Sequence, residues 1–354
     1  MTPPIPDAKT FFLAELMPDF FRAMSYEEYV VETSKKKGTL KKPLPHSELD
    51  YYAKNSLATM QFSNSIEINF ACVAIHETVR PLRDFLESCY IAVVPETDIN
   101  AGAHYVNPDY SGHIIDLGAG TLNWFNYFLA PLVTLAWVMD KDTSETERES
   151  MTVLLGEQLD DLSYLTENKD SFSAINRLSR PSFPRKEMYV EHVYYKQGTF
   201  IFILLHELGH HALKHTKESP LGLFEADVSA YVSSQPNGAH ADEFEADFFA
   251  NRSILEAVSN RGFGAEQQSV SIELNSVAIG GVLALMGIAY SSKEFFKASK
   301  SHPSLEKRLS ACVGFYLSEF AKYGTEFGMQ LCEMFSSVLP GDRTELTSLF
   351  SVRR

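Results

Sequence analysis

Hydrophobic and polar positions along the chain follow two different periods, which predict a mostly helical protein with one small sheet. Apolar residues three and four positions apart run through 198–215 and 243–258, which is typical of helices with one buried face. Cys89–Val94 is instead a short run of β-branched and aromatic residues that Pro95 ends, as in a buried strand. The predicted fold class is therefore α+β, mainly helical.

Further strands and helices are expected on both sides of these segments. Residues 100–106 and 113–117 flank a turn rich in proline and glycine, so we expect them to form a hairpin. Residues 189–195 alternate weakly and are expected to form a strand that leads into the helix at 198–215. Other helices are expected at 151–165, 269–290, 305–323 and 326–338, with a pair of helices within 47–88.

Two segments are apolar enough to raise the question of a membrane. Residues 124–139 contain Asn126 and Pro131, and residues 277–290 are uniformly apolar but short. A helix that spans a bilayer needs about 20 apolar residues. We therefore expect both segments to be buried core helices.

Charge and cysteine content narrow the class of protein further. The formal net charge is −15 at pH 7, which argues against binding to nucleic acid or to anionic lipid, because both need a basic surface. The first residues contain neither a basic segment nor a long apolar one, so we expect no signal peptide. None of the 4 cysteines forms a C-x-x-C pair, and we expect reduced thiols in a cytoplasmic protein.

The candidate chemistry lies in the helix at 198–215, which carries His206-Glu207-Leu208-Gly209-His210. Residues four apart lie on the same face of a helix, so His206 and His210 can offer two imidazoles to one metal ion. Glu207 flanks the same position, where a carboxylate can take a proton from water. H-E-x-x-H in such a helix is a signature of zinc peptidases.

A third ligand is expected further along the chain, because catalytic zinc usually has three protein ligands and one open position. Glu243 and Asp247 lie four apart on one face of the next helix, so Glu243 is the candidate ligand. Asp247 would then accept a hydrogen bond from the second nitrogen of a ligand histidine. The alternatives are Glu225, which belongs to an earlier copy of the same F-E-A-D tetrad, and Glu245 or Asp242.

Four sequence features, taken in order, resemble the gluzincin metallopeptidases and especially the CAAX prenyl endopeptidase-like family. They are an N-A-x-A segment before an edge strand, H-E-x-x-H, E-x-x-x-D and H-P-x-x-x-x-R, found here at 100–103, 206–210, 243–247 and 302–308. The H-E-x-x-H motif is also similar to that of the phage-exclusion Lit-type peptidases. The resemblance implies a zincin-like domain that holds one zinc ion and cleaves a protein or peptide substrate.

The resemblance implies roles for individual residues. His206, His210 and Glu243 would bind zinc, and Glu207 would be the general base.

The remaining roles fall on residues outside the metal motif. His302 and Arg308 would bind the oxyanion or grip the substrate backbone, and His302 could instead take the fourth zinc position in a resting state. Asn100 and Ala101 would lie in the edge strand that binds an extended peptide through main-chain hydrogen bonds.

The expected organisation has three parts. An N-terminal helical region at 1–88 precedes a zincin-like core at 89–260, which has an insertion at about 140–186. A C-terminal helical region at 261–354 would complete the site. The length of 354 residues allows two domains or one large one.

We therefore predict a soluble zinc-dependent metalloendopeptidase. Two other classes stay open, namely an interaction protein that retains zinc without cleaving, and a zinc hydrolase of non-peptide amides. The intact Glu207 argues against the first of these. An extended groove along residues 100–117 would favour a peptide substrate over the second.

Overall fold

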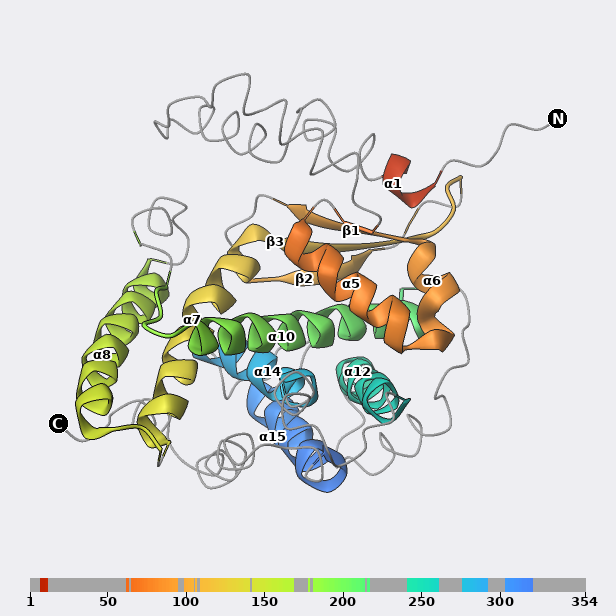
Figure 1. Cartoon of the computed structure of the whole chain (residues 1–354). Helices are drawn as coiled ribbons and strands as arrows, with labels where there is room; N and C mark the ends of the chain where they lie inside the picture. Colours follow the sequence, from red (N-terminus) through yellow and green to blue (C-terminus); the bar gives the residue numbers. More distant parts are fainter. Residues whose placement is uncertain are drawn as a thin grey trace, which may run out of the picture. The chain divides into compact units, whose positions relative to one another are not determined.

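The structure is a computed structural model that describes residues 7–11, 62–63, 65–94, 99–104, 106, 109–140, 142–168, 178, 181–213, 215–216, 241–260, 276–291 and 303–320. Its strands are β1 (Cys89–Val94), β2 (Ala101–His104) and β3 (His113–Gly118). Its helices are α1 (Ala8–Phe11), α5 (Ile66–Thr78), α6 (Arg83–Glu87), α7 (Ala119–Met139), α8 (Glu145–Glu167), α10 (Lys186–Ala212), α12 (Ala241–Asn260), α14 (Gly280–Ser291) and α15 (Leu305–Phe315), with the short helical segments η3 (Arg80–Leu82) and η4 (Tyr316–Phe320). The protein is mainly helical with one small sheet, which confirms the predicted α+β class (Figure 1).

The chain divides into two compact units, and the division passes through α10. One unit comprises residues 1–121 and 207–223, and the other comprises residues 122–206 and 224–354. α10 is a single continuous helix across this division, so the spacing of residues along it follows from helical geometry. The organisation in three regions stays a prediction.

The first unit contains a three-stranded mixed sheet in the order β1-β3-β2. β1 is parallel to β3, with Cys89 opposite His113, and β2 is antiparallel to β3, with Ala101 opposite Leu117. All of β1 is buried, whereas β2 is partly exposed at the edge of the sheet. The strand at Cys89–Val94 and the β2–β3 hairpin confirm the sequence predictions, and β2 is the strand of that hairpin that lies at an edge.

The second unit has a helical core in which aromatic side chains and close helix crossings dominate. The indole Nε1 of Trp124 on α7 donates to the carbonyl oxygen of Gly287 on α14 at 2.9 Å. Phe125 packs edge-on against Phe128 and Phe200. α14 lies beside α15, and both contact α12 (Figure 1).

α7 is the one helix in the described part of the chain that is long and apolar enough to cross a membrane. In its most apolar window, 61% of the residues are buried inside the protein, and Pro131 lies within the helix. α14 is shorter, with 12 residues, and nearly all of it is buried. Both helices therefore have the burial expected of core helices.

The strand expected at 189–195 is wrong, because these residues belong to α10. Their buried positions, Met188, His192 and Tyr195, recur at spacings of four and three, which is a helical period. The weak alternation in the sequence comes from apolar side chains that face solvent, namely those of Tyr189, Val190 and Val193. The helix expected at 326–338 lies outside the described residues.

α10 and α14 cross with their backbones in direct contact. A Cβ placed on Gly280 would lie 2.3 Å from the carbonyl oxygen of Gly198, and one on Gly198 would lie 2.0 Å from that of Ser276. Only glycine allows backbones to approach this closely. The crossing lies about two helical turns before His206, so it helps to fix the helix that carries the H-E-x-x-H motif.

Gly280→Ala should lower the free energy of unfolding by about 3 kcal/mol, because the added methyl group must push two backbones apart. Gly156→Ala in α8 is the matched control, since nothing lies within 4 Å of a Cβ at that position. Alanine is the better helix former by about 1 kcal/mol, so the control should be slightly stabilised. Urea unfolding measures both changes, and wild-type stability in Gly280→Ala would contradict the close crossing.

Candidate metal centre

The H-E-x-x-H motif occupies the last turns of α10, which ends at Ala212. The apolar run at 200–205 is buried and anchors this part of the helix in the core. His206 and Glu207 are each 7% exposed, and His210 is half-buried. One helical turn separates the two histidines, so both imidazoles project from the same side of α10.

α12 presents two of its acids, Glu243 and Asp247, to the imidazole of His206. Nε2 of His206 lies 3.5 Å from Oε2 of Glu243, and Nδ1 lies 2.9 Å from Oδ1 of Asp247. Both carboxylates are buried, with 8% and 2% of their surface exposed. Each ring nitrogen of His206 therefore faces a different carboxylate.

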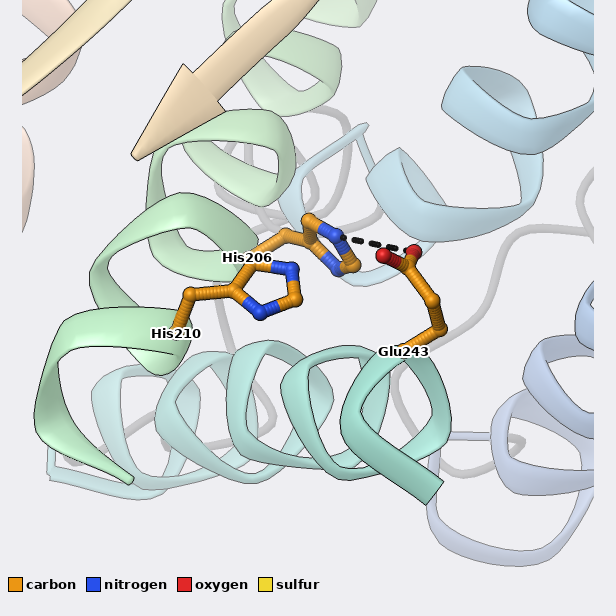
Figure 2. Close-up of side chains that lie close together, drawn as sticks. All are labelled: His206, His210 and Glu243. Atoms are coloured by element: carbon orange, nitrogen blue, oxygen red, sulfur yellow. Dashed lines mark ion pairs between the residues drawn. The ribbon is translucent and has the colours of Figure 1, made fainter. Parts of the chain in front are cut away.

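The side chains of His206, His210 and Glu243 lie close together, as Figure 2 shows. One potential ligand atom from each residue lies within 4.8 Å of the others. Two imidazole nitrogens and one carboxylate oxygen suit zinc, and a tetrahedral ion would keep a fourth position for water. Because Asp247 holds Nδ1 of His206, Nε2 of that ring is left for a metal. The donor set therefore fits a catalytic zinc ion.

Arg308 on α15 is buried against the same two carboxylates. Its Nε and Nη2 donate to Oδ2 and Oδ1 of Asp247 at 2.8 and 2.7 Å, and Nη1 lies 2.8 Å from Oε2 of Glu243. A bidentate pair of this kind fixes the orientation of the carboxylate. The geometry favours a positioning role for Arg308 over direct contact with a substrate oxyanion.

The charges in this cluster follow from burial and from these contacts. Burial alone would lower the pKa of His206, but hydrogen bonds to Asp247 and Glu243 outweigh it and raise that pKa to about 10. Burial also opposes ionisation of Asp247, yet Arg308 and His206 hold its pKa below the ordinary value. These contacts favour the protonated imidazole of His206 in the metal-free cluster, and a metal bound to that ring would compete with the proton.

The alternative third ligands differ from Glu243 in their burial. Asp242 is exposed and Glu245 is half-buried, whereas Glu243 is buried beside His206. Glu225 lies outside the described residues. Of these candidates on α12, Glu243 is therefore the buried one beside His206, and its carboxylate is grouped with both histidines of the motif.

Of the other predicted site residues, the structure describes Asn100 and Ala101 but not His302. Asn100 immediately precedes β2, and its carbonyl oxygen accepts hydrogen bonds from Gly118 N at 3.0 Å and from Thr121 Oγ1 at 2.8 Å. Ala101 is the first residue of β2 at the sheet edge. His302 lies outside the described residues, so its two predicted roles stay predictions.

Two contacts of the centre were missed by reasoning from the sequence. One is the bidentate pairing of Arg308 with Asp247, and the other is a 2.9 Å contact between Nδ1 of His210 and Nδ1 of His215. A histidine just beyond the end of the motif helix was the available signal for the second contact. No comparable local pattern indicates the first.

A buried H-E-x-x-H helix with an acid pair beside it is the arrangement expected of a hydrolase, and comparison with protein families gives the class as a peptidase. The sequence matches the Peptidase U49 family over residues 139–327, which include α8, α10, α12, α14 and α15. The chain belongs to this family. The match supports a peptidase without assigning it to the gluzincin or CAAX prenyl endopeptidase-like families. Comparisons with curated proteins and with solved structures give no match.

Proposed function

We propose that the protein is a zinc-dependent metalloendopeptidase of the gluzincin type, acting on a protein or peptide in the cytoplasm. The observation that carries the proposal is the grouping of ligand atoms from His206, His210 and Glu243 within 4.8 Å. Membership of a peptidase family supports hydrolysis of peptide bonds as the reaction.

The residues of the site would each have a separate role in the reaction. Zinc held by His206, His210 and Glu243 would supply a Lewis acid that lowers the pKa of water and polarises the scissile carbonyl. Glu207 would take the proton of the attacking water and deliver it to the leaving amine. Asp247 would hold His206 in the tautomer that leaves Nε2 for the metal.

The sheet edge supports a peptide as the class of substrate. β2 begins at Ala101 and lies at the edge of its sheet, where an extended chain can add as a further strand. Ala101 would supply main-chain groups for this pairing, whereas both main-chain groups of Asn100 already bond to Gly118 and Thr121. An oxyanion donor is also needed for amide hydrolysis, and His302 stays the candidate for it.

The metal content of the purified protein tests this proposal. Wild-type protein should contain about one zinc ion per chain, and Glu243→Ala should lose it because a site with two histidines holds zinc only weakly. Glu245→Ala, in the same helix but half-buried, and Glu225→Ala should both retain the ion. Circular dichroism of the metal-free proteins would show whether each variant still folds.

Two results of this experiment would change the proposal. Absence of zinc from the wild-type protein after metal addition would overturn it, because the mechanism then lacks its Lewis acid. Loss of zinc in Glu225→Ala with retention in Glu243→Ala would assign the third ligand to Glu225.

A further inference from the structure

We propose that His215 positions His210 as a metal ligand, in the way that Asp247 positions His206. The inference rests on the proposed zinc site and adds to it a residue outside the H-E-x-x-H motif. Nδ1 of His210 and Nδ1 of His215 are 2.9 Å apart. Their ring centroids are 5.0 Å apart, and the ring planes meet at 65°.

The way in which α10 ends brings His215 back over His210. The helix stops at Ala212, and the N–H of Leu213 donates to the carbonyl oxygen of Gly209 at 2.9 Å. The N–H of His215 then donates to the carbonyl oxygen of His210 at 2.8 Å. These bonds satisfy carbonyl groups that a helix end would leave without partners. His215 is thus joined to His210 through both main chain and side chain.

His211, next to His210, also anchors the turn that follows α10. Nδ1 of His211 lies 2.8 Å from Oγ1 of Thr216, and its Nε2 lies 3.0 Å from the carbonyl oxygen of Ile114 on β3. His211 is 1% exposed, so this contact is part of the core of the first unit. The turn after α10 therefore holds two successive histidines of the helix by their side chains.

A hydrogen bond between two imidazoles requires one donor and one acceptor. Because His215 contacts Nδ1 of His210, a metal would bind His210 through Nε2. With a metal on Nε2 of His210, Nδ1 of that ring would carry the proton and donate it, and Nδ1 of His215 would accept it. The contact would hold the ring orientation of His210 and stabilise the tautomer that metal binding at Nε2 requires, as partners of metal-bound histidines generally do.

Zinc affinity, measured by competition with a chromophoric chelator, tests this role in the full-length protein. His215→Ala should bind zinc about 10–100-fold more weakly than wild type. His215→Asn should remain close to wild type, because its side-chain oxygen can accept a hydrogen bond near the position of Nδ1. His76→Ala is the control, since His76 also makes a side-chain hydrogen bond, to Glu87 at 3.0 Å, but lies on α5.

Nitrogen-15 NMR of the zinc-loaded wild-type protein gives a second measurement that does not depend on a variant. It should show His210 bound to metal through Nε2 and protonated on Nδ1. Metal bound to Nδ1 of His210, wild-type affinity in His215→Ala, or a second zinc ion that His215→Ala loses would each overturn the positioning role. Wild-type protein that binds no zinc would instead overturn the proposed function itself, so the two failures are distinct.

Discussion

Glu207→Gln should reduce peptide hydrolysis by about a thousandfold while the protein still binds zinc. The amide has nearly the shape of the carboxylate but cannot accept a proton from the attacking water. His206, His210 and Glu243 are unchanged, so metal binding should persist. Cleavage of a complex peptide mixture, followed by mass spectrometry beside zinc content, measures both properties in one preparation.

Glu187→Gln provides the matched control for this substitution. Glu187 lies in the first turn of the same helix and is exposed, so the same chemical change there should leave both cleavage and zinc content unchanged. Full activity in Glu207→Gln would exclude Glu207 as the general base. Loss of zinc in Glu207→Gln would mean that this carboxylate supports the metal site rather than the proton transfer.

Most of the fold could be predicted because local patterns determine it. β1 has the bounds of the β-branched run that predicted it, Cys89–Val94. The first half of α10 was misread, because exposed Tyr189 and Val193 place apolar side chains on its solvent side. The crossing of α10 with α14 depends on which two glycines meet, and the period of one helix does not specify its partner.

Helical geometry alone predicts which residues of the candidate site share a face of one helix, whereas the expected grouping of Glu243 and Arg308 with His206 came from the usual ligand number of zinc and from the family resemblance. His206 and His210, like Glu243 and Asp247, are four apart, so helical geometry alone places each pair on one face. Arg308 contacts Asp247 across 61 positions of sequence, and no local period predicts such a contact. The contacts of residues just beyond a helix end, such as His215, likewise depend on the turn rather than on a period.

Asp247→Ala should lower the free energy of unfolding of the metal-free protein by about 3 kcal/mol or more. Asp247 is 2% exposed, accepts two hydrogen bonds from Arg308 and lies 2.9 Å from Nδ1 of His206. Its removal leaves a buried guanidinium with Glu243 as its carboxylate partner among the described residues. Urea unfolding in the presence of a chelator measures the loss without any contribution from zinc.

Asp242→Ala is the control in the same helix, because Asp242 is exposed and its loss should change stability little. The double variant Asp247→Ala/Arg308→Met should be more stable than the sum of the two single changes predicts, since it also removes the uncompensated charge. Strict additivity would show that the two residues are not energetically coupled. Zinc affinity should nevertheless stay about 10–100-fold below wild type in the double variant, because Nδ1 of His206 still lacks its acceptor. The double variant would then regain stability without regaining zinc affinity. That result is expected if Asp247 compensates the charge of Arg308 and, independently of this, orients the ligand His206.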